Sequence, residues 1–114
     1  MNKKSFDTSD EVMAPSPKTH IEAIKTEYGD VRRSTFQPGW KWTVDIKPGA
    51  GTDTCPVHHL MIGLSGRLNT VMADGTEVEM GPGDVLDIPP GHDGWVVGDE
   101  PFVGIDLGGL LTES

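Results

Sequence analysis

The chain has 114 residues, the size of one small domain, and its Leu, Ile, Val and Phe content exceeds the ~20% below which disorder is the better interpretation. Its longest nearly apolar run, residues 60–64, is far below the ~20 residues of a membrane helix, which excludes a helix-spanning membrane protein. The net charge is -9, and residues 68–114 contain no Lys or Arg, so neither nucleic acid nor an anionic membrane is an expected partner.

The N-terminal residues and the cysteine content both favour a cytoplasmic location. The first ten residues lack the apolar segment of a secretory signal. Cys55 is the single cysteine and permits no internal disulfide, as is usual in a reducing compartment. In that setting Cys55 is a free thiol, a metal ligand or a small buried hydrophobe.

Residues 1–18 predict a short, loosely structured N-terminal arm, because Pro15 and Pro17 stop the helical turn that residues 7–11 could begin. Residues 19–114 predict one domain, in which short strand-like runs alternate with Gly- and Pro-containing turns. The expected strands are Ile21–Ile24, Val31–Phe36, Trp40–Ile46, His59–Leu64, Leu68–Ala73, Thr76–Met80, Val85–Ile88, Trp95–Val97 and Phe102–Leu107.

These runs have no helical pattern between them and predict an all-β, antiparallel sandwich or barrel. The clearest hairpin is at Asp74-Gly75, which lies between two of the runs. This dipeptide predicts a type I′ turn, in which both central residues have positive φ.

Residues 52–59 contain the first candidate site. Thiol and imidazole groups are preferred ligands of transition metals, and this stretch holds Cys55, His58 and His59. On one straight strand Cys55 and His59 would lie ~13 Å apart, too far to share an ion, but a bend at Pro56 would bring them together. Adjacent histidines on a strand point to opposite faces, and this alternation alone allows either His58 or His59 to face inward.

A second candidate site follows the rigid turn Pro89-Pro90-Gly91, which would aim His92. Large apolar side chains are candidates to line a ligand pocket: Trp40, Trp42, Met61 and Trp95. The competing interpretation is a buried inert thiol, exposed imidazoles and aromatic rings that only fill the core.

Two segments resemble motifs of the cupin superfamily. Residues 81–92, GPGDVLDIPPGH, are similar to its second motif, and residues 59–68, HLMIGLSGRL, are similar to the strand and turn that end its first motif. The similarity covers roughly residues 30–108 and is closest to single-domain cupin-2 proteins, through PPGHDGWVVGDEP at residues 89–101. The resemblance implies an antiparallel, jelly-roll cupin β-barrel.

The resemblance also implies a metal site. The ligand positions of the first motif fall on Asp53, Cys55 and His59, and His92 stands for the histidine of the second motif. We therefore expect metal ligands at Cys55, His59 and His92, with Asp53 and His58 as additional candidates. The common cupin set of three histidines and one carboxylate is not reproduced, and a Cys/His/His set favours zinc over iron, nickel or copper.

Three functions are consistent with these residues. The first is a metal-binding cupin that acts on a small molecule of unknown identity, as a metal-dependent enzyme. The second is a non-catalytic ligand- or metal-binding sensor or accessory module. The third is a degenerate cupin without metal. Cupins are commonly dimers, so the resemblance also implies a homodimer.

Overall fold

The computed structural model describes residues 1–111 as nine strands with short helical turns. The strands are β1 (Glu11–Ser16), β2 (Thr19–Thr26), β3 (Gly29–Phe36), β4 (His59–Ser65), β5 (Arg67–Met72), β6 (Glu77–Met80), β7 (Val85–Ile88), β8 (His92–Val97) and β9 (Phe102–Asp106). The helical turns are η1 (Phe6–Thr8), α1 (Trp42–Asp45), α2 (Lys47–Ala50) and η2 (Gly108–Leu110).

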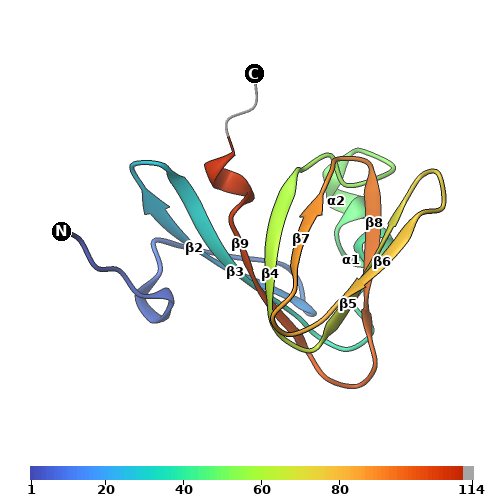
Figure 1. Ribbon diagram of the computed structural model, residues 1–114, viewed down its shortest axis with the longest axis horizontal. Helices are drawn as coiled ribbons and strands as arrows, with labels where there is room; N and C mark the ends of the chain where they lie inside the picture. Colours follow the sequence, from blue (N-terminus) through green and yellow to red (C-terminus); the bar gives the residue numbers. More distant parts are fainter. Residues whose placement is uncertain (112–114) are drawn as a thin grey trace.

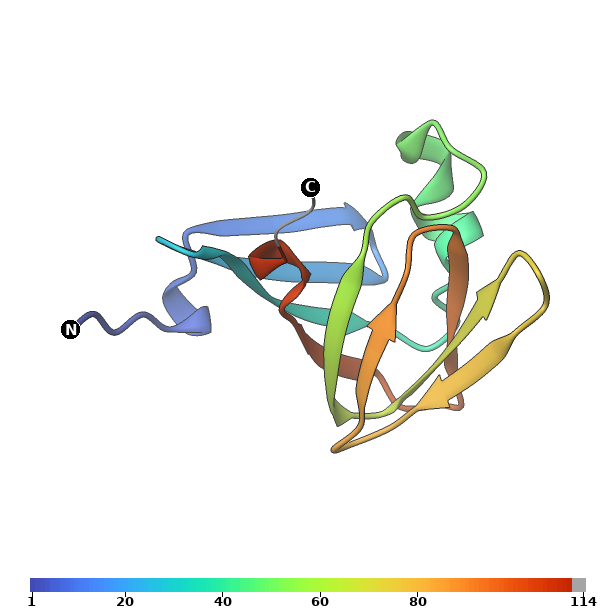
Figure 2. The same ribbon diagram turned by 45° about the horizontal axis from the view of Figure 1, so that its top comes forward.

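The strands form two antiparallel sheets. The larger sheet has the order β1-β2-β3-β9-β4-β7, and the smaller has the order β6-β5-β8 (Figure 1). Figure 2 shows the smaller sheet facing the β4–β7 end of the larger one, with α1 and α2 beside β8. The all-β antiparallel class is therefore confirmed. The expected barrel is not closed, because no strand ladder within residues 1–111 joins the two sheets.

The N-terminal arm is more ordered than the sequence predicts. Strand β1 lies within residues 1–18 and pairs with β2, with Met13 opposite Ile21. The helical turn η1 already ends at Thr8, well before the two prolines, and Pro15 lies within β1. An edge strand tolerates a proline because its outer side needs no N–H donor. The boundary between an arm and a domain at residue 18 stays a prediction.

The strand expected at residues 40–46 is wrong, because α1 occupies most of this range and α2 follows directly after it. The side chain of Asp93 accepts hydrogen bonds from the backbone N–H and the hydroxyl of Thr43, both at 3.2 Å. It thereby satisfies an N–H in the first turn of α1, which has no partner inside the helix. Asp93 is distant in the sequence, so local patterning could not reveal this contact.

The hairpin between β5 and β6 is confirmed, but its turn differs from the predicted type I′. Gly75 has a φ of +91°, whereas Asp74 does not have a positive φ. The N–H of Gly75 donates to the carbonyl of Met72 at 3.0 Å. This pattern fits a three-residue loop in which the glycine alone takes the left-handed conformation.

The core lies between the two sheets. Its buried side chains come from both sheets and from the segment between β3 and β4, and they are Phe36, Trp40, Trp42, Cys55, Met61, Leu68, Met80, Ile88, Val96 and Phe102. Apolar side chains also lie on the outer face of β4 and β7, where Leu64 and Val85 are exposed. That face would suit the expected homodimer, which stays a prediction. Among the described residues, no helix has the length and apolar character needed to cross a membrane.

Candidate metal centre

Three side chains from different parts of the chain meet at one side of the core. The potential ligand atoms of Cys55, His59 and His92 all lie within 4.8 Å of one another. Cys55 comes from the segment before β4, His59 begins β4, and His92 begins β8. The structure therefore brings together the three residues expected as metal ligands.

Backbone hydrogen bonds hold Cys55 beside His92. The N–H of Cys55 donates to the carbonyl of His92 at 2.9 Å, and the N–H of Gly91 donates to the carbonyl of Cys55 at 2.8 Å. This short antiparallel bridge fixes the backbone of both residues. Because Pro56 follows, the chain leaves the bridge and returns to start β4 at His59, four residues after Cys55.

A carboxylate from the neighbouring strand orients His59. Nδ1 of His59 lies 2.6 Å from Oδ2 of Asp106, and the acceptor is a carboxylate, so Nδ1 is the donor. The other oxygen of Asp106 accepts from the N–H groups of Leu60, at 3.3 Å, and Gly108, at 2.8 Å. Nε2 of His59 is left facing Sγ of Cys55 at 3.6 Å. A histidine held in this way by a carboxylate is the usual arrangement in metal sites.

The ring of His92 is oriented in the same manner by a backbone carbonyl. Its Nδ1 donates to the carbonyl of Pro89 at 2.7 Å, since a carbonyl can only accept. The rings of His59 and His92 meet edge to face, with their centroids 5.1 Å apart. Both histidines thus direct Nε2, rather than Nδ1, toward the thiol.

The charges in the cluster are coupled. Burial raises the pKa of the Cys55 thiol, but hydrogen bonds with His59 and His92 outweigh burial and lower it to about 6. Burial lowers the pKa of His59, but its hydrogen bonds to Asp106 and Cys55 raise it to about 9. Burial likewise raises the pKa of Asp106, and contact with His59 brings it below its usual range. Without a metal, the cluster is therefore a thiolate beside an imidazolium at neutral pH.

One pair of donor atoms has the spacing of two ligands on a tetrahedral ion. With Zn–S near 2.3 Å and Zn–N near 2.0–2.1 Å, a sulfur and a nitrogen on the same zinc lie about 3.6 Å apart. The distance between Sγ of Cys55 and Nε2 of His59 has this value. One thiolate and two imidazoles are also a donor set typical of zinc. The three side chains could therefore hold such an ion, and binding would release the proton between Cys55 and His59.

The two additional candidate ligands are not part of the cluster. The side chain of Asp53 is fully exposed, and Lys47 is its ion-pair partner at 3.5 Å. His58 contacts Asp87 of β7 instead. The position of His58 follows from the alternation of extended residues, because His59 faces inward and its neighbour His58 therefore faces outward. The structure thus answers which of the two histidines points into the core.

The cluster lies in the wall of a cavity of about 650 Å³ between the sheets. Three of the four expected pocket residues line this cavity, namely Trp40, Trp42 and Met61. Trp95 does not, because burial alternates along β8 and places His92, Gly94 and Val96 inward. Trp95 lies on the outer face, where the ammonium of Lys41 is 5.4 Å from its ring centroid.

The sequence analysis did not identify Asp106 as part of the site. The signal was present in β9, where alternation makes Phe102, Gly104 and Asp106 the buried side chains. A carboxylate at an inward position of an otherwise apolar strand needs a partner, because burying an unpaired charge is costly. An inward acidic residue at a strand end was therefore a usable indication of a site.

Asp106→Asn is expected to lower the metal affinity about 10- to 100-fold, the usual effect of losing a carboxylate that orients a ligating histidine. The amide keeps the size of the side chain but supplies a weaker acceptor. The measurement is a zinc titration in competition with a chromophoric chelator. Asp93→Asn, which alters the carboxylate at α1, is the control, and an equal loss in both variants would contradict a specific role of Asp106.

Comparisons with known proteins place the fold. No family model matches the chain, and no curated protein matches it either. Solved structures do match. A protein of unknown function from Rhizobium leguminosarum is 22% identical with a TM-score of 0.66, and the match covers 93% of each chain.

Two further structures carry informative descriptions. A double-stranded β-helix protein from Klebsiella pneumoniae is 17% identical, with a TM-score of 0.59, over 93% of this chain and 87% of that one. A cupin-like protein from Thermotoga maritima is 19% identical, with a TM-score of 0.55, over 85% of this chain and 79% of that one. At these identities the similarity concerns the fold alone, and that fold is the double-stranded β-helix.

Proposed function

We propose that this protein, which has the cupin fold, binds a transition-metal ion through Cys55, His59 and His92 and presents it to a small molecule in the cavity between its sheets. Zinc is the ion that the donor set favours. The observation that carries the proposal is the convergence of three donor atoms within 4.8 Å in the cavity wall. One pair of these atoms, Sγ of Cys55 and Nε2 of His59, has the spacing of two ligands on one tetrahedral ion.

The number of protein ligands supports an open site rather than a closed one. Structural zinc centres use four protein ligands, whereas catalytic centres use three and leave a position for water or substrate. Within residues 1–111, the group that converges contains three residues, and neither Asp53 nor His58 joins it. The cavity gives a small molecule access to the remaining position.

An ion bound in this way would polarise an oxygen of a ligand or lower the pKa of a bound water. The protein's own contribution is to fix the donors. Asp106 and the carbonyl of Pro89 hold the two imidazole rings. The aromatic side chains Trp40 and Trp42 keep the adjoining cavity apolar. This environment is suited to a metal-dependent enzyme, and it also suits a sensor that recognises the same ligand.

The alternative is a degenerate cupin without metal. One observation favours it, because Cys55 and His59 already satisfy each other through their contact at 3.6 Å. In that case the cluster is a charge pair in the core, and the cavity binds organic ligands alone.

Metal analysis of the wild-type protein separates these functions. The protein is purified without a histidine tag, stripped with a chelator, reloaded with zinc and desalted, and its metal content is measured by elemental mass spectrometry. We expect close to one ion per chain. His58→Ala removes a histidine outside the cluster and should retain the same content. A wild-type protein that retains neither zinc nor, when these are used for reloading in turn, iron, nickel or copper would refute the proposal in favour of the metal-free cupin.

A further inference from the structure

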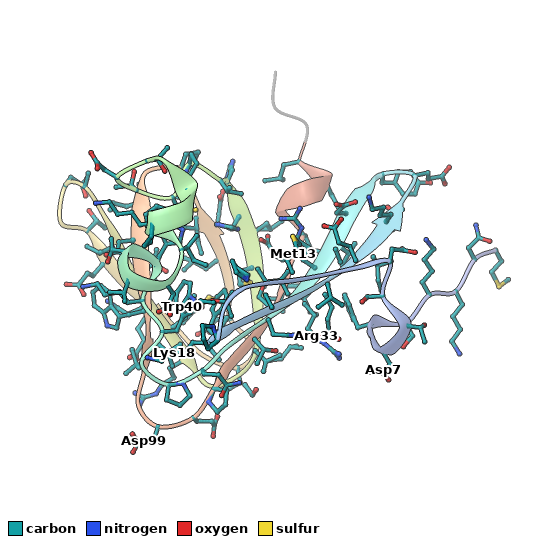
Figure 3. All side chains as sticks on the ribbon, turned by 180° about the vertical axis from the view of Figure 1, so that it is seen from behind. Asp7, Met13, Lys18, Arg33, Trp40 and Asp99 are labelled. Atoms are coloured by element: carbon teal, nitrogen blue, oxygen red, sulfur yellow. The ribbon has the colours of Figure 1, made fainter. Side chains whose placement is uncertain are left out.

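Two adjacent arginines on β3 have opposite environments. Arg33 faces outward and makes two hydrogen bonds of 2.8 Å to the carboxylate of Glu22 on β2. It also approaches Asp7 at 3.6 Å and the ring of Phe6. Figure 3 shows Arg33 on the side of the sheet that carries Asp7, away from the labelled Met13. Strand alternation directs the preceding residue, Arg32, to the other face.

Arg32 lines the same cavity as the metal cluster. It is half-buried, and its Nε is a buried polar atom without a hydrogen-bond partner in the described part of the chain. Its recorded ion pair, between Nη2 and Asp30, is 3.8 Å long and is therefore beyond hydrogen-bonding distance. Leaving a buried donor unpaired is costly, so such a group calls for an explanation.

The carboxylate across the strand ladder does not satisfy Arg32 either. Asp106 lies directly opposite Arg32 across the β3–β9 ladder. Its two oxygens, however, are already engaged by His59, Leu60 and Gly108. The guanidinium therefore places a positive charge in the cavity wall, and its Nε–H has no acceptor within the described residues.

The surroundings of Arg32 indicate which kind of ligand would supply the missing hydrogen-bond acceptor. Arg32 is the one Lys or Arg among the described residues that line the cavity. The other walls are largely apolar and include the stacked rings of Phe36 and Trp40, whose centroids are 4.0 Å apart. A guanidinium presents a planar fork of donors that matches the two oxygens of a carboxylate. The net charge of -9 favours a monoanion over a more highly charged ligand.

We infer that the cavity ligand is a monocarboxylic acid with an apolar body, and that Arg32 is its anchoring residue. The inference rests on the proposed function in one respect. The end of the ligand opposite to its carboxylate would face Cys55, His59 and His92. One strand, β9, separates β3 from β4, so the axes of β3 and β4 lie about 10 Å apart. The ligand therefore needs several bonds between its carboxylate and the group that faces the metal cluster.

The test measures binding of small probe acids to the metal-loaded protein. Benzoate, phenylpropanoate and phenylbutanoate are titrated while the fluorescence of the tryptophans is followed, because Trp40 and Trp42 line the cavity. Phenylpropanamide and phenylethylphosphonate serve as neutral and dianionic counterparts. We expect at least one carboxylate to bind, and its amide to bind at least about tenfold more weakly, since hydrogen bonds to a charged group are the strong ones.

Substitutions then assign the carboxylate to Arg32. Arg32→Gln should lower the carboxylate affinity about tenfold or more and leave the weak affinity for the amide unchanged. Arg32→Lys should lie in between, because it keeps the charge and loses the fork. Arg67→Gln is the matched control: it removes the same charge from an exposed residue with a loose ion pair to Glu79, and should bind as the wild type does.

Metal content, measured in parallel, keeps this inference separate from the proposed function. Arg32→Gln should retain the wild-type zinc content, since Arg32 is not a ligand. If the wild type retains no metal on reloading but still binds the acids in a way that depends on Arg32, the metal proposal fails and the carboxylate site stands. The inference is overturned if no probe acid binds the wild type at millimolar concentration, if Arg32→Gln leaves the carboxylate affinity unchanged, or if the phosphonate binds more tightly than the acid.

Discussion

Replacing Cys55 or His92 by alanine is expected to reduce the zinc affinity by more than about a hundredfold. Loss of a residue that only orients a ligand already costs 10- to 100-fold, and loss of a ligand itself should cost more. With two protein ligands left, the ion would also exchange one protein donor for water. Competition with a chromophoric chelator measures the affinity of each variant.

The fold should survive both substitutions. The bridge between Cys55 and His92 uses backbone groups, namely the N–H of Cys55 and the carbonyl of His92, which alanine retains. Circular dichroism of the metal-free variants checks this point. His58→Ala is the matched control for the histidine variant, because His58 contacts Asp87 away from the cluster. Zinc affinities within a factor of a few of the wild type in both ligand variants would rule out the assigned ligands.

The thermal stability that zinc adds should distinguish the same variants from the wild type. An ion that binds the folded chain stabilises it by an amount that grows with the ratio of free ion to dissociation constant. The wild type should therefore melt at a higher temperature with zinc than without it, and this increment should be largely lost in Cys55→Ala and His92→Ala. An increment that persists would point to a zinc site elsewhere.

Phe102→Ala is expected to lower the free energy of unfolding by about 3–5 kcal/mol, a large part of the ~5–15 kcal/mol of a typical domain. The side chain of Phe102 has no exposed surface. Its ring lies 6.1 Å from that of Phe36 and packs over Gly104, where an added Cβ would come within 2.8 Å of it. Alanine would leave a cavity that the two sheets cannot fill by a small shift. Urea unfolding followed by circular dichroism measures the loss.

Val103→Ala provides the comparison for this prediction. Val103 is the next residue of β9 and lies half-buried on its outer face, so its truncation should cost about 1 kcal/mol or less. If Phe102→Ala does not fold, Phe102→Leu provides a milder change that should still cost more than Val103→Ala. Equal losses for the inner and outer residues would contradict the assignment of the core to the inner face of β9.

Much of the fold could be predicted from local sequence because its strands carry local signals. The runs at residues 59–64, 68–73, 76–80, 85–88 and 102–107 correspond to β4, β5, β6, β7 and β9 within one or two residues. The segment at residues 40–46 was misassigned because alternating tryptophans resemble a strand. Its conformation depends instead on Asp93, which comes from β8 and supplies the hydrogen bonds that the start of α1 requires.

The candidate metal cluster was predictable to a similar degree. The residue types identified Cys55, His59 and His92, and the cupin-like motifs selected His59 over His58. Neither approach could find Asp106, because it reaches His59 across the β4–β9 pairing. Trp95 was expected in the cavity because its side chain is large and apolar. The register of β8 directs it outward instead.

The sequence by itself determined the all-β antiparallel class, most strand positions and the three residues that meet at the cluster. The class and the strand positions follow from turn residues and alternation, which act over a few neighbouring positions. The three residues follow from ligand chemistry together with the resemblance to the cupin motifs, which selects His59 over His58. Only the tertiary structure decided that the barrel is open, that Asp106 orients His59, and that Arg32 enters the cavity while Arg33 leaves it. These features depend on which strands pair and in which register, and one residue of register reverses every side chain on a strand.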